Sequence, residues 1–502
     1  MKRINSFMLM LGCCLLTAGL QAQTAPNGQA STRTLIVFFD GLRPDYITPE
    51  LMPHLYAFKK QGTYGQEHHS VFPTVTRVNA SSYSTGSYPA THGLMGNSVY
   101  FPEVSKTKSI NTGEAEELQK VITATNGHLL TAVTLGELMQ AQGKRMMVFS
   151  SGSTGQALLQ NHTISGGAII NPGMILPASI KDSVTRDLGP IPAEGKHKWV
   201  TDALIRYGLA NNGPEVSAIW YGDPDHNGHE HGIGAPETVA ALKTVDAQFG
   251  RIIETLAQKG LTDSYNILIS TDHGFATHVG KAGLVPLLIA GGFKQSAYSE
   301  DVVVAGGAIY IKDHNEALIE KIVAALQPLE WVGAIFTKAA KPGDAQGHVK
   351  GTLSFDLIHW NHERAADILV DANWDDRKNA AGYAGATYIP GVAGHGTLAP
   401  YDVHIPLIVS GPAFKKASES KLPTSNVDLV PTVLYIQGIA IPKAADGRVM
   451  YELLRSATAP VLKPKKEKIE TMADYAGGHY KLTLERTILG KYWYVDFAKT
   501  ER

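Results

Sequence analysis

The sequence predicts an α/β protein in which a largely parallel sheet lies between two layers of helices. Apolar runs of strand length alternate with longer segments whose apolar residues recur at helical spacing. The runs are continuous, which is typical of strands that are covered on both faces. Several of them end in a carboxylate, and ligands of such sheets bind beyond the carboxyl ends of the strands. A functional site is therefore expected at that edge of the sheet.

Five apolar runs are the expected strands, and three longer segments are the expected helices. The strands are expected over residues 34–40, 145–150, 216–221, 265–272 and 404–410. The helices are expected over residues 55–60, 135–142 and 236–259. Strands that alternate with helices along the chain form an α/β sandwich. Asp40, Asp225 and Asp272 would then lie at the carboxyl edge of its sheet.

Two segments interrupt this alternation. After residue 301 the chain continues through a short apolar run, a helical stretch and mixed short segments, which indicates an inserted α+β subdomain. After residue 455 a part of the chain alternates apolar and polar residues, as an antiparallel hairpin does. The expected organisation is a core of residues 33–301 and 388–455, an insert of residues 302–387 and a C-terminal β extension of residues 456–502.

The composition is that of a folded globular protein. Of the 502 residues, 44% are hydrophobic and 18% are charged, which excludes a disordered or fibrous chain. The formal net charge of −1 provides no broad cationic surface, so the sequence does not predict nucleic-acid binding. A small molecule is the expected partner. The oligomeric state does not follow from the sequence.

The first 22 residues predict a signal peptide. Two basic residues precede an apolar stretch at residues 7–20, which is short for a membrane span. The expected location is the periplasm or the medium, with no transmembrane segment after removal of the signal; an uncleaved anchor and a lipoprotein linked through Cys13 are the alternatives. Cys13 and Cys14 are the only cysteines, so a metal site in the mature chain would use nitrogen and oxygen ligands.

Three short motifs offer metal ligands at expected strand ends or in the loops beyond them. Asp225 and His229 are four residues apart, Asp272 and His273 are adjacent, and His395 lies between two glycines. Each motif alone would also suit a hydrogen-bonded loop. Together with Asp40 they supply three carboxylates and three histidines. This donor set matches that of a dinuclear zinc site.

The segment from residue 72 to residue 86 offers a nucleophile. Pro73 and Thr74 suit a turn, and the residues from Thr76 onward suit a helix that ends at Gly86. Backbone N–H groups at the start of a helix can bind a phosphoryl oxygen. Without metal ligands elsewhere in the chain, Thr76 would be interpreted as a helix cap. Because a divalent ion can activate a hydroxyl, the expected ligands favour Thr76 as a nucleophile.

Five motifs then follow one another along the chain: FFDGLRPDY, FPTVTRVN with TGSYPATHGLMGN, DPDHNGHEHG, STDHG and GHGTLAPYDVHIPLIVSGPAF. In these motifs the chain resembles the type I phosphodiesterase and nucleotide pyrophosphatase family of the alkaline phosphatase superfamily. The resemblance extends from about Leu35 to Phe414. It implies an alkaline phosphatase-like three-layer sandwich and a two-metal hydrolase of phosphodiester or nucleotide pyrophosphate bonds.

The resemblance also implies roles for individual residues. One ion, expected to be Zn²⁺, would be held by Asp40, Thr76, Asp272 and His273, and a second by Asp225, His229 and His395. Asn97 matches the family asparagine that donates a hydrogen bond to a non-bridging phosphoryl oxygen, and Thr76 would carry a phosphorylated intermediate. Family members have Thr-Phe-Pro-Asn where this chain has Thr76-Arg77-Val78-Asn79. The nucleophile is therefore retained and its flank differs.

Charge favours a diester or a pyrophosphate as the substrate. Three aspartates and one threonine alkoxide balance two divalent ions, so a monoester dianion would gain from an extra cation. Monoesterases of this superfamily supply that cation between the nucleophile and the second metal motif, but residues 150–157 contain no Lys or Arg. Arg77 or Lys281 could still reach the site. A phosphomonoesterase, a phosphonate hydrolase and a catalytically silent periplasmic binding protein are the alternatives.

Trp220 and Tyr221 are the candidate substrate-binding residues. They precede the second metal motif, where family members often carry an aromatic residue that stacks on a nucleobase. The alternative is that both pack in the core, as aromatic residues at the end of a buried strand usually do. The sequence does not identify the alcohol of the substrate.

Overall fold

The computed structural model describes residues 32–458 and 460–502. The predicted signal peptide, residues 1–22, lies outside these ranges together with both cysteines. Among the described residues, no helix combines the length and the apolar character that a membrane span requires.

A ten-stranded sheet forms the centre of the molecule. Its strands follow the order β20 (Ser418–Ser420), β2 (Thr63–His69), β19 (His404–Ser410), β9 (Tyr265–Ser270), β1 (Arg33–Phe39), β8 (Val216–Tyr221), β5 (Met146–Ser150), β6 (Ala168–Asn171) and β7 (Met174–Leu176), and β21 (Thr424–Ser425) pairs with β2. Strands β9, β1, β8, β5 and β6 are parallel, as predicted. The strand at residues 404–410 is antiparallel to both of its neighbours. The sequence did not indicate this direction, because a run that is buried on both faces is apolar whichever way it runs.

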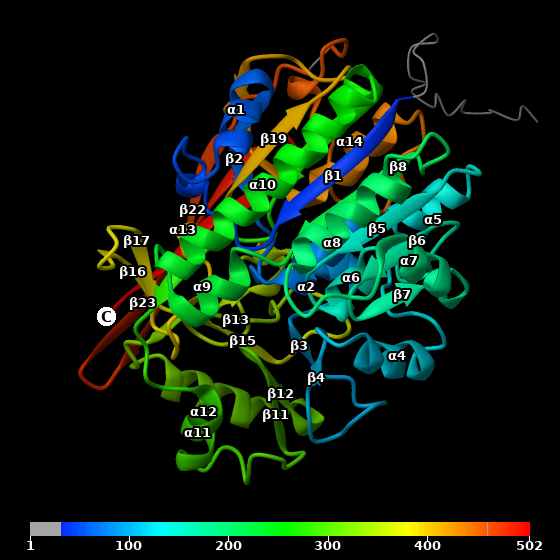
Figure 1. The fold of residues 1–502 in the computed structure, drawn as a ribbon. Helices are drawn as coiled ribbons and strands as arrows, with labels where there is room; N and C mark the ends of the chain where they lie inside the picture. The colour runs from blue at the N-terminus through cyan, green and yellow to red at the C-terminus, as the bar shows by residue number, and fades with distance from the viewer. Residues whose placement is uncertain (1–31, 459) are drawn as a thin grey trace, which may run out of the picture.

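Helices cover both faces of this sheet, which confirms the predicted three-layer arrangement (Figure 1). One face packs against α1 (Pro53–Gln61), α8 (Lys196–Ala203) and α10 (Pro236–Gln258), and the other against α2 (Thr76–Thr85), α4 (Ala115–Ala124), α5 (Leu135–Gln140), α6 (Thr154–Leu159) and α14 (Leu429–Ile436). Leu35 and Val37 of β1 belong to the first core, and Ile36 and Phe38 belong to the second. The continuous apolar run of β1 thus supplies two cores at once.

Shorter elements connect the layers. They are α3 (Pro89–His92), β3 (Ser98–Val99), β4 (Ile110–Asn111), α7 (Lys181–Leu188), α9 (Asp225–His231), α11 (Leu284–Ala290) and α13 (Pro400–Val403). Several of them lie at the carboxyl edge of the sheet, where α9 follows β8 and α13 precedes β19.

The insert builds a separate five-stranded sheet. Its order is β11 (Val302–Ala305), β12 (Ala308–Ile311), β15 (Ile368–Ala372), β13 (Val332–Thr337) and β14 (Leu353–Ser354), and the helix α12 (Glu316–Leu326) packs with it. The last part of the predicted insert pairs with strands of the core instead. Strands β16 (Trp374–Lys378) and β17 (Ala384–Thr387) join β10 (Ala276–His278) and β18 (Ala393–Gly394) of the core in a four-stranded sheet. The sheet of the insert therefore ends at Ala372.

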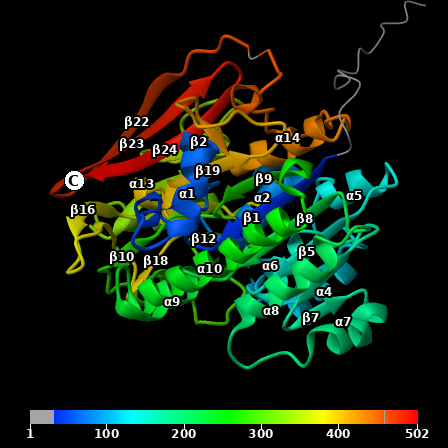
Figure 2. The same cartoon turned by 45° about the horizontal axis from the view of Figure 1, so that its top comes forward.

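The C-terminal residues form a three-stranded antiparallel sheet of β22 (Lys465–Tyr475), β23 (Gly478–Leu489) and β24 (Tyr492–Glu501) (Figure 2). The predicted hairpin corresponds to β23 and β24. This sheet contacts both other parts of the chain: Tyr480 Oη donates to the Gly333 carbonyl in the insert at 2.9 Å, and Asp496 lies 2.9 Å from His69 of the core. It therefore connects the insert to the core.

Because two histidines are buried, we expect the free energy of unfolding to fall in acid. His68 and His92 are fully buried, and burial lowers the pKa of each to about 3. Since the unfolded chain binds these protons at higher pH than the folded chain, their contribution to stability is present above pH 6.5 and is lost as the pH falls towards 3. Urea unfolding in the presence of a chelator should show a lower free energy of unfolding at pH 4.5 than at pH 7.5.

The substitution His92→Gln should reduce this pH dependence, because it removes one of the histidines whose pKa is lowered by burial. The matched control is His479→Gln, since His479 is exposed. An unchanged slope of unfolding free energy against pH in His92→Gln would show that the acid sensitivity has another source.

Candidate metal and nucleophile site

Three aspartates meet at the carboxyl edge of the central sheet. Asp40 follows β1, Asp272 lies two residues beyond β9, and Asp225 is the first residue of α9. The Asp40 N–H donates to the Tyr221 carbonyl at 2.9 Å, and the Asp225 N–H donates to the Asp40 carbonyl at 3.0 Å. Gly41 has a φ of 71°, and a Cβ there would lie 3.1 Å from Asp225 Cβ. The close approach of these two segments therefore requires glycine after Asp40.

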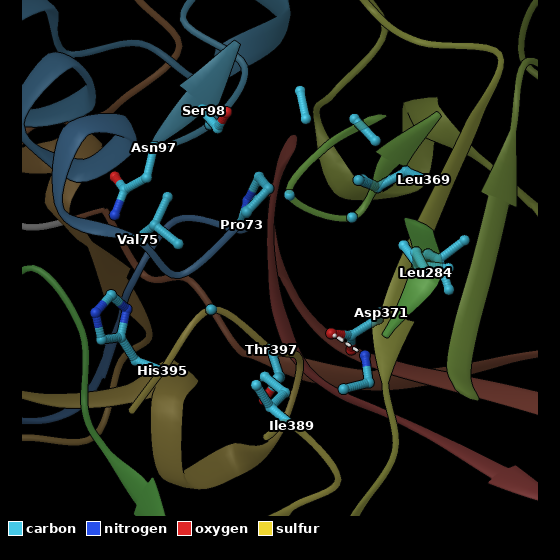
Figure 3. Close-up of a pocket in the computed structure, with 18 of the residues that line it drawn as sticks. Pro73, Val75, Asn97, Ser98, Leu284, Leu369, Asp371, Ile389, His395 and Thr397 are labelled. Carbon is cyan, nitrogen blue, oxygen red and sulfur yellow. Dashed lines mark hydrogen bonds between the residues drawn. The ribbon is translucent and has the colours of Figure 1, made fainter. Parts of the chain in front are cut away.

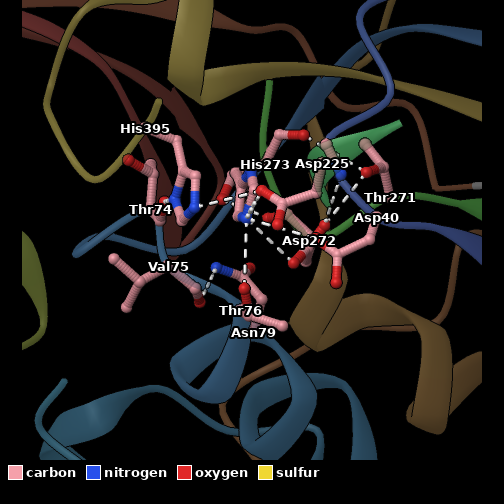
Figure 4. Close-up of polar contacts among 12 residues, drawn as sticks. Asp40, Thr74, Val75, Thr76, Asn79, Asp225, Thr271, Asp272, His273 and His395 are labelled. Carbon is pink, nitrogen blue, oxygen red and sulfur yellow. Dashed lines mark hydrogen bonds and ion pairs between the residues drawn. The ribbon is translucent and has the colours of Figure 1, made fainter. Parts of the chain in front are cut away.

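Six side chains form two groups with the composition of metal sites. Asp40, Asp272 and His273 form the first group, and Asp225, His229 and His395 form the second. Within each group the candidate ligand atoms lie within 4.8 Å of one another. The groups adjoin, because His273 Nε2 lies 3.0 Å from Asp272 Oδ2 and 4.0 Å from Asp225 Oδ1 (Figure 4). The structure thus brings together the six side chains that the sequence motifs single out.

Backbone carbonyls orient the three histidines. His229 Nδ1 lies 2.9 Å from the Ala393 carbonyl, His273 Nδ1 lies 2.9 Å from the Gly274 carbonyl, and His395 Nδ1 lies 2.9 Å from the Thr74 carbonyl. A carbonyl oxygen only accepts, so Nδ1 carries the proton in each ring. The lone pair of Nε2 then faces the carboxylates, with His229 and His395 at 3.2 and 3.3 Å from Asp225 Oδ1. This is the tautomer in which histidine binds a metal through Nε2.

Each aspartate of the two groups keeps one buried oxygen without a hydrogen-bond donor among the described residues. These atoms are Asp40 Oδ1, Asp225 Oδ1 and Asp272 Oδ2. The second oxygen of Asp272 accepts a hydrogen bond from the Gly41 N–H at 3.1 Å. Burying a carboxylate oxygen without a donor is unfavourable unless a cation pairs with it. The residues present therefore fit divalent cations with nitrogen and oxygen ligands.

The carboxyl groups also repel one another. Burial, and then the negative charges of Asp272 and Asp225, raise the pKa of Asp40 well above its ordinary value. Burial alone would also raise the pKa of Asp225, but contacts with His229 and His395 hold it well below the ordinary value. Three carboxylates in one buried site need positive charge beside them, either as protons or as metal ions.

Thr76 is the first residue of α2, and its hydroxyl faces the first group. Its Oγ1 lies 3.3 Å from His273 Nε2. Asn79 holds the preceding turn, because its Nδ2 donates to the carbonyls of Val71 at 3.0 Å and Val75 at 3.2 Å. The sequence motifs did not single out Asn79 as a functional residue. The signal that could have found it is the asparagine that closes the family's Thr-Phe-Pro-Asn motif.

Asn97 lies beside the start of the same helix. Its Oδ1 accepts a hydrogen bond from the Arg77 N–H at 3.0 Å, and its backbone carbonyl accepts one from the Thr112 N–H, also at 3.0 Å. Oδ1 is thus occupied as an acceptor, which directs the amide group, and Nδ2 remains as a donor for another ligand. Asn97 shares a cavity wall with Val75 and His395 (Figure 3). Its position suits a hydrogen bond to an oxygen of a phosphoryl group.

Trp220 and Tyr221 present no face on which a nucleobase could stack. Both side chains are 0% exposed, and Trp220 stacks on Phe38 with ring centroids 4.5 Å apart. The prediction that they bind substrate is therefore wrong, because β8 is covered on both faces up to its last residue. Trp220 instead supports the site, since its Nε1–H donates to Asp40 Oδ2 at 2.9 Å. That hydrogen bond leaves Asp40 Oδ1 for the first group.

Trp220→Phe is expected to weaken metal binding by about 10- to 100-fold, as loss of a residue that orients a ligand does elsewhere. Phenylalanine keeps an aromatic ring against Phe38 and removes the donor to Asp40. The Kd for Zn²⁺ can be measured by competition with a chromogenic chelator. Trp199→Phe is the matched control, because Trp199 is also buried but its Nε1 has no hydrogen-bond partner among the described residues. Equal affinities in both variants would contradict this role of Trp220.

Arg77 and Lys281, the two cations that could reach the site according to the sequence, lie in different places. Lys281 is exposed in the loop before α11. Arg77 follows Thr76 in α2, and its guanidinium lies against Gly113, where a Cβ would collide with Arg77 Nη2. Arg77 Nε is buried without a hydrogen-bond partner among the described residues. Of the two cations, Arg77 is the one adjacent to Thr76 in the chain, and its guanidinium is directed to Gly113.

Comparison with known proteins assigns the chain to a family. A family model described as type I phosphodiesterase / nucleotide pyrophosphatase matches residues 34–376, which is more than half of the chain. The chain belongs to this family. The matched region contains Thr76, Asn97 and five of the six metal-group side chains, and His395 follows it.

Curated relatives of the chain are members of the same family. Bis(5'-adenosyl)-triphosphatase enpp4 of Xenopus laevis is 23% identical over 435 residues, which cover 82% of this chain and 79% of the relative. The Mus musculus protein of that name is 26% identical over 421 residues, with the same two coverages. Ectonucleotide pyrophosphatase/phosphodiesterase family member 7 of Homo sapiens is 26% identical over 278 residues, which cover 54% of this chain and 55% of the relative. The chain is thus a hydrolase of the phosphodiesterase and nucleotide pyrophosphatase class.

A solved structure supports the fold. Murine ectonucleotide pyrophosphatase / phosphodiesterase 5, in an inactive form in complex with AMP, superposes with a TM-score of 0.59 and 18% identity. The match covers 84% of this chain and 100% of that chain. The alkaline phosphatase-like fold that the motifs implied is therefore confirmed.

Proposed function

We propose that the chain is an exported hydrolase that uses two zinc ions and a phosphorylated Thr76 to cleave phosphodiester or nucleotide pyrophosphate bonds. Export rests on the N-terminal sequence alone. The observation that carries the proposed chemistry is the position of the Thr76 hydroxyl, which lies 3.3 Å from His273 Nε2 at the first residue of α2. A catalytically silent binding protein would not need a complete set of six ligand side chains.

In the first step the Thr76 oxygen attacks phosphorus in line with the leaving oxygen. The bond from Thr76 to phosphorus forms as the bond from phosphorus to the leaving oxygen breaks, and the proton of the Thr76 hydroxyl ends on the leaving alcohol. When bound, the two ions supply positive charge that lowers the pKa of the Thr76 hydroxyl and stabilises the leaving oxygen. Asn97 Nδ2 donates to a non-bridging phosphoryl oxygen, and N–H groups at the start of α2 add to this stabilisation.

In the second step water attacks phosphorus from the side that the leaving group has vacated. The bond between Thr76 and phosphorus breaks, one proton of the water passes to the Thr76 oxygen, and the other is released to solvent as the monoester ionises. The product from a diester is a monoester with an additional negative charge.

The segment between the nucleophile and the second metal motif favours a diester over a monoester. Residues 150–157 carry no cation. Ser151 Oγ instead lies 2.8 Å from His197 Nδ1, and His197 Nε2 lies 2.7 Å from Asp223 Oδ2. Arg77 keeps a phosphomonoesterase as the second candidate, because its Nε lacks a partner among the described residues.

The test compares kcat/KM for bis(4-nitrophenyl) phosphate and for 4-nitrophenyl phosphate, before and after chelation. We expect the diester to be preferred by about tenfold or more, which corresponds to about 1.4 kcal/mol in the barrier. Both activities should disappear with the chelator and return with Zn²⁺. A preference for the monoester that is lost in Arg77→Gln would support the second candidate, and diester hydrolysis that survives chelation would contradict a metal-dependent mechanism.

A further inference from the structure

A cavity of about 370 Å³ adjoins the candidate site and lies between the core and the insert, both of which line it. Asn97, His395 and Val75 form part of its wall on the core side (Figure 3). Leu369 and Asp371 of the insert strand β15 lie on the opposite wall, with Leu284 beside them. The volume is at the lower end of the range of small-molecule pockets. The cavity is therefore large enough for a group attached to the reacting phosphorus.

The chemistry of the wall limits what that group can be. Aliphatic side chains and several glycines make up most of the lining, with the aromatic residues Phe72, Trp331 and Tyr388, and the described residues that form it include no Lys or Arg. Moving a phosphate or diphosphate group from water into such a space without a cation is unfavourable. An apolar group would instead gain by leaving water.

The acidic group in the lining does not change this conclusion. Asp371 Oδ1 accepts a hydrogen bond from the Ala372 N–H, and Asp371 Oδ2 accepts one from the Leu398 N–H, each at 2.9 Å. Burial also raises the pKa of Asp371 well above its ordinary value, which favours its neutral form. The carboxyl group is thus occupied by the backbone and offers little attraction to a cationic ligand.

The position of His395 indicates which part of a substrate enters the cavity. His395 belongs to the second group with Asp225 and His229, which in the proposed mechanism faces the leaving oxygen. Thr76 contacts His273 of the first group. Because attack and departure are in line, the leaving group extends away from Thr76 on the side of the second group. His395 lines the cavity on that side.

We propose that this cavity binds the leaving group, and that the preferred substrate is a phosphodiester of an uncharged, apolar alcohol instead of a nucleoside polyphosphate. This inference rests on the proposed function. The enzyme therefore transfers the phosphoryl group of such a diester to Thr76, releases the apolar alcohol into the cavity and then hydrolyses the phosphorylated threonine.

A series of methyl n-alkyl phosphates tests the proposal through the identity of the products. Phosphorus NMR at low conversion distinguishes methyl phosphate from an alkyl phosphate. We expect methyl phosphate and the longer alcohol, with kcat/KM rising by up to about fourfold for each methylene until the cavity is full. Alkyl phosphate and methanol as the main products, or a rate that is independent of chain length, would overturn the proposal.

Two further substrates distinguish apolar from charged leaving groups. Methyl 3,3-dimethylbutyl phosphate has the shape of the methyl choline ester without its positive charge, so we expect it to react at least as fast. A faster choline ester, or a higher kcat/KM for ATP than for methyl octyl phosphate, would overturn the assignment. If bis(4-nitrophenyl) phosphate is not cleaved either, the proposed function itself fails, which is a separate outcome.

A variant that fills the cavity provides the structural control. Leu284 is partly exposed at the first residue of α11 and lines the cavity, whereas Leu287, one turn later, is partly exposed and does not line it. Leu284→Trp should lower kcat/KM for methyl octyl phosphate by about tenfold or more and spare dimethyl phosphate, and Leu287→Trp should change neither. Ile389→Trp, on the partly exposed loop across the cavity, gives the same test should Leu284→Trp fail to fold. Unchanged chain-length dependence in the cavity variant would place the leaving group elsewhere.

Discussion

Thr76→Ala is expected to lower kcat/KM for a phosphodiester by about three orders of magnitude or more. In enzymes with a covalent intermediate, removal of the nucleophile abolishes the acceleration that depends on it and leaves the part that comes from binding and electrostatics. The structure supports so large an effect because Oγ1 of Thr76 lies 3.3 Å from His273 Nε2. The rate of nitrophenolate release from bis(4-nitrophenyl) phosphate measures this loss.

Two comparisons separate chemistry from folding in this experiment. Thr85→Ala removes a hydroxyl from the last residue of the same helix, where it donates to the Ser81 carbonyl at 2.7 Å, and should leave the activity in place. Thr76→Ser keeps a hydroxyl and should still form the intermediate. Acid-quenched protein analysed by mass spectrometry should carry phosphate on residue 76 in the wild type and in the serine variant. Full activity in Thr76→Ala would exclude a covalent mechanism at this residue.

Asp225→Asn is expected to lower the metal content from two ions per chain to one. The substitution removes the carboxylate that His229 and His395 share, and it leaves Asp40, Asp272 and His273 intact. Since a metal ion that stabilises a developing oxyanion contributes several kcal/mol, kcat/KM should fall by about two orders of magnitude or more. Metal analysis after dialysis against limiting Zn²⁺ measures the stoichiometry directly.

Asp246→Asn is the matched control for this substitution. Asp246 is also buried, but it accepts the backbone N–H groups of His54 and Leu55 at 3.0 and 2.8 Å and belongs to neither metal group. Its variant should retain both ions, even where it lowers stability. Two ions in Asp225→Asn, bound with wild-type affinity, would contradict the division into two groups.

Metal binding should also weaken as the pH falls. Without metal, burial and then the charges of Asp272 and Asp225 raise the pKa of Asp40, so binding an ion displaces a proton from this site. At lower pH that proton competes more strongly with the ion. A titration of Zn²⁺ affinity against pH should therefore show proton release in the wild type.

Most side chains of the two candidate metal groups could be predicted from the sequence because they lie at or near the ends of recognisable elements. Asp40 and Asp272 terminate apolar runs, and strands that are parallel neighbours end at the same edge of the sheet. Asp225 and His229 are spaced four apart, which places both on one face of the helix α9. Local pattern and sheet topology therefore agree at this site.

The contribution of Trp220 could not be predicted in the same way. Its role depends on the parallel register of β1 and β8, which pairs Phe38 with Trp220 and brings the indole to Asp40. An apolar run shows that a strand is buried, but it does not show the direction or the register in which the strand pairs. For the same reason the antiparallel direction of β19 became clear only in the structure.

The strand β22 escaped prediction for another physical reason. Its sequence KKEKIETMADY is rich in charged residues, and most of its side chains are exposed or partly exposed. As an edge strand of a three-stranded sheet it needs little apolar surface, and charges on an edge oppose pairing with other molecules. Hydrophobic periodicity therefore gave only a weak signal for this strand.

The division of the cavity between two parts of the chain has a consequence for how such an enzyme diversifies. All six metal-group side chains come from the core, and the insert supplies Leu369 and Asp371 to the opposite wall of the cavity. In the proposed mechanism, mutations in β15 or its neighbours would therefore alter which alcohol fits and leave the six metal-group side chains in place. In evolution or in engineering, substitutions within the insert would then vary the range of substrates without changing any of the six side chains of the metal groups.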